Sequence, residues 1–125
     1  MPKKKVAGIG ASSDRGKFSN KAVRAYADQG WEVYPVNPKG GQIEGLTAYK
    51  SLEEVPVKVD RITLYLPPEV GVKVLAEVAE AGAAEFFVNP GADSDELLEE
   101  AKRLGLDPIA ACSIVDIGTS PAKYT

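Results

Sequence analysis

Short apolar runs alternate with amphipathic stretches along most of this chain. The first run begins at Lys5 and ends at two glycines, Gly8 and Gly10. Further apolar runs of strand length predict buried strands at 31–36, 61–66, 85–88 and 107–111, with a brief edge strand at 45–49. Apolar residues at helical spacing predict helices over 19–29, 68–82 and 93–104, with a capped helical turn at 51–54.

The first helix has recognisable end signals. Ser19 is its predicted N-cap, and Phe18 and Val23 are placed as a hydrophobic staple around it. Gly30 supplies the left-handed residue that ends the helix. At the other end of the chain, the tail from Asp116 shows no such pattern and is predicted to be irregular.

Strands that alternate with helices at this spacing predict a parallel, doubly wound sheet. We expect a single Rossmann-like α/β domain over residues 1–125, with three layers (α/β/α) and the strand order 3-2-1-4-5-6. In such sheets a ligand lies outside the carboxyl ends of the strands, where the winding reverses. The predicted ends are the stretches 10–13, 36–39, 66–68 and 88–91.

The first strand ends in a glycine-rich turn. Gly8 and Gly10 occupy the first two places of the dinucleotide fingerprint G-x-G-x-x-G, and Ser13 stands in the third. Glycines let backbone N–H groups approach a ligand closely, which points to a phosphate cradle. A tight strand-to-helix turn that binds nothing has the same pattern, so both interpretations stay open.

Charge is unevenly distributed along the chain. A net charge of −3 over 125 residues argues against a general nucleic-acid binder. Residues 1–50 hold nine Lys or Arg and four Asp or Glu, whereas residues 51–125 hold six and fourteen. The basic half contains the glycine-rich turn, which favours an anionic ligand there.

The chain has no histidine and one cysteine, Cys112. This excludes histidine general bases, most zinc sites and an internal disulfide. Paired acids, a nucleophile elbow and metal-ligand spacing are absent from the sequence, so we expect neither catalytic nor metal-binding residues. The first residues lack the apolar region of a signal peptide and no apolar run could span a bilayer, so we expect a cytoplasmic protein without membrane contact.

The end of the second strand indicates the kind of nucleotide. A NAD site places an acidic side chain there to bind the ribose hydroxyls, whereas this chain has Asn37, Pro38 and Lys39. A neutral or cationic group tolerates a phosphate on the ribose, which NADP and coenzyme A (CoA) carry and NAD lacks. CoA and NADP are therefore favoured over NAD, although Asn37 and Pro38 also turn the chain.

Several of these stretches occur together in a known family. They are Gly10-Ala11-Ser12, Ser19-Asn20 at a helix start, and Gly-Trp-Glu-Val-Tyr-Pro-Val-Asn-Pro at 30–38. In this combination the chain resembles the CoA-binding protein family, whose small domains are similar to the N-terminal domain of the succinyl-CoA synthetase α subunit. The resemblance continues through 39–42, 45–46 and 64–68, and weakens after about Gly91.

The resemblance implies that CoA binds at the carboxyl ends of the strands. Its phosphates would be held by backbone N–H groups and hydroxyls of the loop, which consists of Gly10, Ala11, Ser12 and Ser13. Lys39 matches a lysine that meets CoA in the synthetase, and we expect it on a phosphate of the nucleotide end.

Other predicted contacts come from neighbouring stretches. Arg15 and Lys17 would add positive charge beside the loop, while Pro67 and Pro68 would form an apolar wall for adenine. The predicted set is completed by Asn37, Pro38, Leu66, Asn89, Pro90 and Gly91.

One departure from the synthetase bears on function. The synthetase transfers a phosphoryl group through a histidine in a second domain, and this chain has no histidine. We therefore expect a non-catalytic module that binds CoA or an acyl-CoA. Three alternatives stay open: an NADP-binding redox or sensor domain, a CoA-binding subunit whose catalytic residues lie on a separate chain, and an interaction domain with a vacant crevice.

Two further expectations concern Cys112 and assembly. Cys112 falls near the end of the last strand, where family members often carry a cysteine. We expect it to act as a small buried hydrophobe, with a thiol that meets the CoA sulfur as the alternative. Besides the nucleotide ligand, the expected partners are a second copy of the chain or a partner protein.

Overall fold

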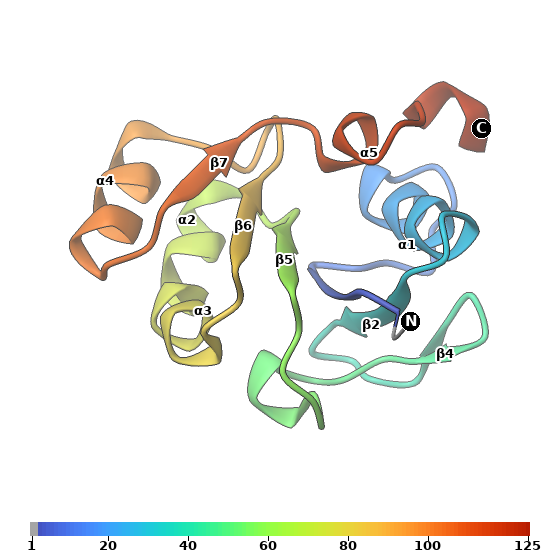
Figure 1. Ribbon diagram of the computed structural model, residues 1–125, viewed down its shortest axis with the longest axis horizontal. Coiled ribbons are helices and arrows are strands. Elements are labelled where there is room, and N and C mark those ends of the chain that lie inside the picture. The colour runs from blue at the N-terminus through green and yellow to red at the C-terminus, as the bar shows by residue number, and fades with distance from the viewer. Residues whose placement is uncertain (1–2) are drawn as a thin grey trace.

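The computed structural model describes residues 3–125, which form a five-stranded sheet between two layers of helices (Figure 1). The strands of this sheet are β1 (Lys5–Ile9), β2 (Glu32–Val36), β5 (Arg61–Leu64), β6 (Glu85–Val88) and β7 (Pro108–Ala110). They lie in the order β2-β1-β5-β6-β7, and each neighbouring pair is parallel. The expected doubly wound, Rossmann-like α/β fold is confirmed.

The helices divide between the two faces of the sheet (Figure 1). One face carries α1 (Phe18–Asp28), α5 (Ser113–Asp116) and the 3₁₀ helix η3 (Pro121–Tyr124). The other carries α2 (Pro68–Gly71), η2 (Val72–Val74), α3 (Leu75–Ala81) and α4 (Asp95–Arg103), with η1 (Leu52–Glu54) beside α3. Within residues 3–125, no helix has both the length and the apolar character needed to cross a membrane.

Alternating strand residues fill two separate cores. Val6 of β1 packs with Tyr26 of α1 and Ile114 of α5. On the opposite face, Ile62 and Leu64 of β5 belong to the larger core beneath α3 and α4. Burial on both faces explains why the sequence of these strands contains near-continuous apolar runs.

The edge strand predicted at 45–49, which is strand 3 of the expected order, is the main error in that order. Residues 42–47 instead form a hairpin of β3 (Gln42–Ile43) and β4 (Leu46–Thr47). Only Tyr49 joins the edge of the main sheet, where its N–H donates to the carbonyl of Pro35 at 2.9 Å. Pro35 of β2 has no N–H, so this edge cannot carry a regular ladder of hydrogen bonds.

Two helix predictions also need correction at their starts. The first helix begins at Phe18 with Lys17 at the N-cap, because the chain already turns at the bond from Lys17 N–H to the Asp14 carbonyl (3.1 Å). The predicted cap at Ser19 is therefore wrong. The helix predicted from 93 begins at 95, since the hydroxyl of Ser94 accepts from the N–H of Leu97 at 3.0 Å.

The helix predicted over 68–82 is interrupted rather than continuous. It divides into α2, η2 and α3, and ends at Gly82, whose φ of +65° is left-handed. A Cβ on Gly71 would lie 3.1 Å from a methyl carbon of Leu97 and 3.2 Å from one of Leu64. Gly71 therefore allows α2 to approach both the sheet and α4 closely.

The tail from Asp116 is ordered into short helical turns, not irregular as predicted. Helix α5 ends at Asp116, and η3 follows at Pro121–Tyr124. Tyr124 is buried against α1 and its hydroxyl donates to a carboxylate oxygen of Asp28 at 2.9 Å. Packing against α1 over a sequence separation of about 96 residues stabilises this segment, so local sequence patterns cannot reveal it.

Candidate functional site

The four stretches predicted to meet a ligand all leave the sheet at one edge. Ile9 of β1 is in register with Val36 of β2 and with Leu64 of β5, which is in register with Val88 of β6. The stretches that follow these positions are 10–13, 37–39, 65–68 and 89–91. Because β1 lies between β2 and β5, this edge includes the point where the winding reverses. We call it the carboxyl edge.

Gly10 allows the loop after β1 to pass close to β5. Its φ is +87°, and a Cβ there would lie 3.0 Å from Cδ2 and 3.3 Å from the backbone nitrogen of Leu66. The N–H groups of Gly10 and Ala11 both donate to the carbonyl of Val36, at 3.0 and 3.2 Å. These two residues therefore set the path of the loop, and their own N–H groups are already used by the protein.

Ser12 and Ser13 supply the unused amides of the loop. Neither N–H has a protein acceptor within residues 3–125. The hydroxyl of Ser12 accepts from the N–H of Asp14 at 3.0 Å, which holds the turn in shape. Helix α1 begins shortly afterwards, and its N-cap Lys17 gives no side-chain hydrogen bond. Unpaired N–H groups in a turn and at a helix start favour an anion.

Asn37 connects this loop to the turn that carries Lys39. Its Nδ2 donates to the carbonyl of Ala11 at 2.7 Å, and its Oδ1 accepts from the N–H of Lys39 at 2.8 Å. Its backbone N–H donates to Tyr49. The side chain therefore serves the fold, and its predicted contact with a ligand remains a prediction. Its effect is to place the Lys39 turn directly beside the loop.

The charged residues around the loop differ in their pairing. Lys39 and Lys17 are exposed and form no ion pair within the described chain. Arg15 instead approaches Glu44, with Nε 3.5 Å from a carboxylate oxygen. Glu44 lies in the turn between β3 and β4, so its place beside the loop depended on a hairpin that the sequence pattern did not predict. Lys39 and Lys17 are thus the cations most available to an anionic ligand.

Two residues of α1, Asn20 and Arg24, hold the loop through hydrogen bonds that the sequence pattern did not predict. Asn20 is fully buried, and its Nδ2 donates to the carbonyl of Ser12 at 2.8 Å. Arg24 donates from Nε to Oδ1 of Asn20 at 2.8 Å, and from Nη2 to the carbonyls of Arg15 (2.9 Å) and Tyr124 (2.8 Å). The Ser19-Asn20 pair quoted for the family resemblance was the sequence signal for this contact.

Replacing Arg24 with alanine should loosen the loop and the C-terminal turn together. The change removes three hydrogen bonds from a partly buried guanidinium, so we expect the free energy of unfolding to fall by about 1 to 3 kcal/mol. Limited proteolysis should then cut within 12–17 faster than in the parent chain. Arg24→Lys keeps the charge but lacks the planar fork, and should recover little of the loss. Full stability in Arg24→Lys would contradict this account.

The proline stretch after β5 also lies at the carboxyl edge, where its two prolines differ in exposure. Pro67 is exposed and precedes α2 as its N-cap, whereas Pro68 is half-buried at the first helical position. Leu66 is half-buried and faces the loop at Gly10. Pro67 is therefore the member of this stretch that offers an exposed apolar surface, as an adenine ring would require.

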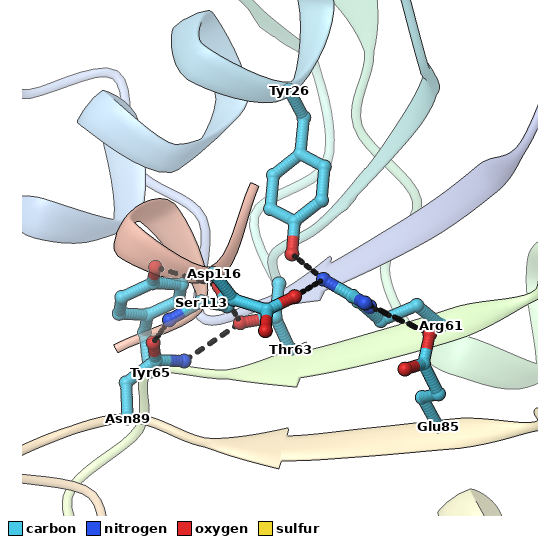
Figure 2. Close-up of polar contacts among 8 residues, drawn as sticks. All are labelled: Tyr26, Arg61, Thr63, Tyr65, Glu85, Asn89, Ser113 and Asp116. Atoms are coloured by element: carbon cyan, nitrogen blue, oxygen red, sulfur yellow. Dashed lines mark hydrogen bonds and ion pairs between the residues drawn. The ribbon is translucent and has the colours of Figure 1, made fainter. Parts of the chain in front are cut away.

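Asn89 is a buried connector rather than a free side chain (Figure 2). Its Nδ2 donates to Oγ1 of Thr63 at 2.6 Å and to the carbonyl of Leu64 at 2.9 Å, and its Oδ1 accepts from the N–H of Ser113 at 2.9 Å. The hydroxyls of Thr63 and Ser113 lie 2.9 Å apart. The three predicted contact residues after β6 therefore differ in exposure. Asn89 is buried and joins β5, β6 and α5, while Pro90 and Gly91 are exposed.

A small cavity lies beside Asn89 at the carboxyl edge. It has a volume of about 120 Å³ and is lined by Phe18, Tyr65, Asn89, Pro90, Cys112 and Ile114. Cys112 is half-buried in its wall. Burial raises the pKa of the Tyr65 phenol above its ordinary value, so this side chain is uncharged in neutral solution. The cavity therefore has an uncharged and largely apolar lining.

A second polar network, at the opposite end of β5, anchors α1 and α5 to the sheet (Figure 2). Arg61 is 5% exposed and pairs with Glu85 at 2.8 Å and Asp116 at 2.9 Å. Its Nη1 donates to the hydroxyl of Tyr26 at 3.2 Å. Burial alone would lower the pKa of Arg61, but the hydrogen bonds with Tyr26 and Glu85 raise it, so the guanidinium stays charged. This network has a structural role away from the carboxyl edge.

This domain has the features of a Rossmann-like nucleotide-binding domain. They are the doubly wound sheet, the loop with unused amides and the exposed lysine beside that loop. Residues 4–118 match the family described as "CoA binding domain". The chain belongs to this family, as the resemblance in its sequence indicated.

Similar proteins include both enzyme subunits and small proteins. The α subunit of acetate–CoA ligase (ADP-forming) II from Pyrococcus furiosus is 34% identical over 78% of this chain, and the match covers 21% of that subunit. The uncharacterized protein YneT from Bacillus subtilis is 28% identical, with 82% of this chain and 76% of that protein covered. A solved conserved hypothetical protein from P. furiosus has a TM-score of 0.79 and 34% identity, with 92% and 99% coverage. The chain thus spans about a fifth of the ligase subunit.

Proposed function

We propose that this chain binds CoA or an acyl-CoA at the carboxyl edge, as a module without catalytic groups of its own. One observation carries the proposal. Asn37 holds the loop with the unused amides of Ser12 and Ser13 next to the exposed Lys39, and no acidic residue follows β2 directly. Membership of the CoA binding domain family supports the same ligand.

In this proposal the ligand extends across the edge in two directions from the loop. The pyrophosphate lies on the N–H groups of Ser12 and Ser13 near the start of α1, where the helix dipole also favours negative charge. Lys39 contacts the 3′-phosphate of the ribose as a charge-assisted donor. The adenine packs on Pro67, and the pantetheine arm runs toward β6 and β7.

A panel of nucleotides tests the proposal against its closest rival, NADP, which the same loop and Lys39 would suit. Thermal unfolding is measured with CoA, NADP and NAD at equal millimolar excess, because a ligand that binds only the folded chain raises the melting temperature. We expect CoA to raise it most and NAD least. A rise with NADP and none with CoA would refute the proposal. Mass spectrometry of small molecules that co-purify with the chain gives a second readout.

A second candidate is a CoA-binding subunit that works beside a catalytic chain. The observation in its favour is the match to a protein that is itself one subunit of acetate–CoA ligase (ADP-forming). Size-exclusion chromatography with light scattering distinguishes this subunit from an independent module, provided that the protein is purified from the organism that produces it. A complex with a larger protein supports the subunit, and a monomer or a homo-oligomer supports the independent module.

A further inference from the structure

We propose that the cavity beside Cys112 holds the acyl group of a short, uncharged acyl-CoA, with its thioester at the cavity mouth. This inference rests on the proposed function and specifies its ligand class. The cavity lies at the carboxyl edge, between the start of α1 and the segments that follow β5, β6 and β7. It is therefore on the side of the edge away from Lys39, where the pantetheine arm would end.

The length of the arm suits this position. Strand β7 lies three strands from β1, a distance of about 14 Å at the usual spacing of neighbouring strands. A pantetheine arm has about as many chain atoms as four amino acids, which span roughly 14 Å when extended. A CoA whose pyrophosphate lies on Ser12 and Ser13 can thus place its sulfur next to Cys112 and Pro90.

The chemistry of the lining selects an uncharged group. The polar atoms of the Asn89 side chain are all bonded to Thr63, Leu64 and Ser113. The phenol of Tyr65 is uncharged and lies 3.4 Å from the hydroxyl of Ser113. No Lys or Arg lines the cavity within residues 3–125. A carboxylate placed there would lose its hydration without gaining a partner.

The volume sets an upper limit on the acyl group. At about 120 Å³ the cavity is slightly smaller than an apolar protein cavity of about 150 Å³ that binds benzene. Acetyl, propionyl and butyryl groups fit within that space, whereas an eight-carbon chain does not. Because the lining offers few hydrogen-bond partners, water binds weakly in the cavity and is readily displaced by methylene groups.

Titration calorimetry with a series of ligands tests the inference on the unmodified chain. From acetyl-CoA to butyryl-CoA, each added methylene should tighten binding by about fourfold, the value for full burial of one methylene. Octanoyl-CoA should bind no more tightly than butyryl-CoA, and succinyl-CoA no more tightly than CoA. Equal affinities along the series would overturn the inference, and so would a steady gain up to octanoyl, which would indicate an open apolar surface.

Filling the cavity gives a matched test. In Cys112→Leu the gain from acetyl to butyryl should fall to less than twofold, whereas Cys112→Ser should retain the gain. Alkylation of Cys112 by N-ethylmaleimide, followed by protein mass, gives a readout without any variant. Butyryl-CoA should slow it more than acetyl-CoA at equal site occupancy, and equal slowing would count against the inference. If CoA itself fails to bind, the proposed function is refuted; if CoA binds and the series is flat, only this inference fails.

Discussion

Replacing Asn89 with alanine is expected to lower the free energy of unfolding by about 3 to 5 kcal/mol, as measured by urea denaturation. The side chain makes three buried hydrogen bonds, to Thr63, Leu64 and Ser113. Its loss leaves the buried Leu64 carbonyl and Ser113 N–H without their side-chain partner, which costs more than the loss of exposed bonds. Helix α5 should detach from the sheet first.

Asn37→Ala provides the matched control for this prediction. Asn37 also follows a strand, but its side chain makes two hydrogen bonds rather than three and is only half-buried. Its loss should therefore cost about 1 to 2 kcal/mol of stability, since water can reach the groups left behind. Its larger effect should be on ligand affinity, through the position of the loop and of Lys39. A stability loss in Asn89→Ala no greater than in Asn37→Ala would contradict the connector role of Asn89.

Replacing Lys39 with alanine is expected to weaken CoA binding by about 1.5 to 3 kcal/mol, or roughly ten- to a hundredfold. The ammonium group has no ion-pair partner within the described residues, so no internal contact has to be broken before it can meet a phosphate. Binding of dephospho-CoA, which lacks the 3′-phosphate, should change by much less. Titration calorimetry of both ligands measures the difference.

Lys73→Ala is the control for the change in net charge. Lys73 is an exposed lysine of η2, which packs on the face of the sheet opposite α1. Removing it also takes away one positive charge, and affinity for CoA should change less than twofold if the Lys39 effect is a direct contact. If Lys39→Ala lowers the affinities for CoA and dephospho-CoA equally, Lys39 contacts the pyrophosphate and not the 3′-phosphate.

The sheet and its carboxyl edge could be predicted because their signals are local. Parallel strands buried on both faces read as apolar runs, and four of the runs here are followed directly by glycine, asparagine or proline. Once the winding is assumed, the ends of neighbouring strands must meet at one edge. The loop at Gly10 and the turn at Lys39 were placed correctly for that reason, as the register of β1 with β2 shows.

The side-chain roles were harder to predict because they depend on distant segments. Asn37 and Asn89 both precede a proline after a strand, and nothing local distinguishes them. Asn89 is buried because α5 packs against it, and no helix was predicted at 113–116. Arg61 is the first residue of a predicted strand, and its local sequence does not show that the rings of Trp31 and Phe87 lie against it. Long-range packing decides both cases.

The central claim is that the loop and Lys39 together recognise a nucleotide with a phosphate on its ribose. Calorimetric titration of the unmodified chain with CoA and with dephospho-CoA tests it most directly. The account predicts that both ligands bind at a single site and that CoA binds at least about tenfold more tightly, which corresponds to one charge-assisted hydrogen bond. Equal affinity for the two ligands, or no binding of CoA at millimolar concentration, would contradict it.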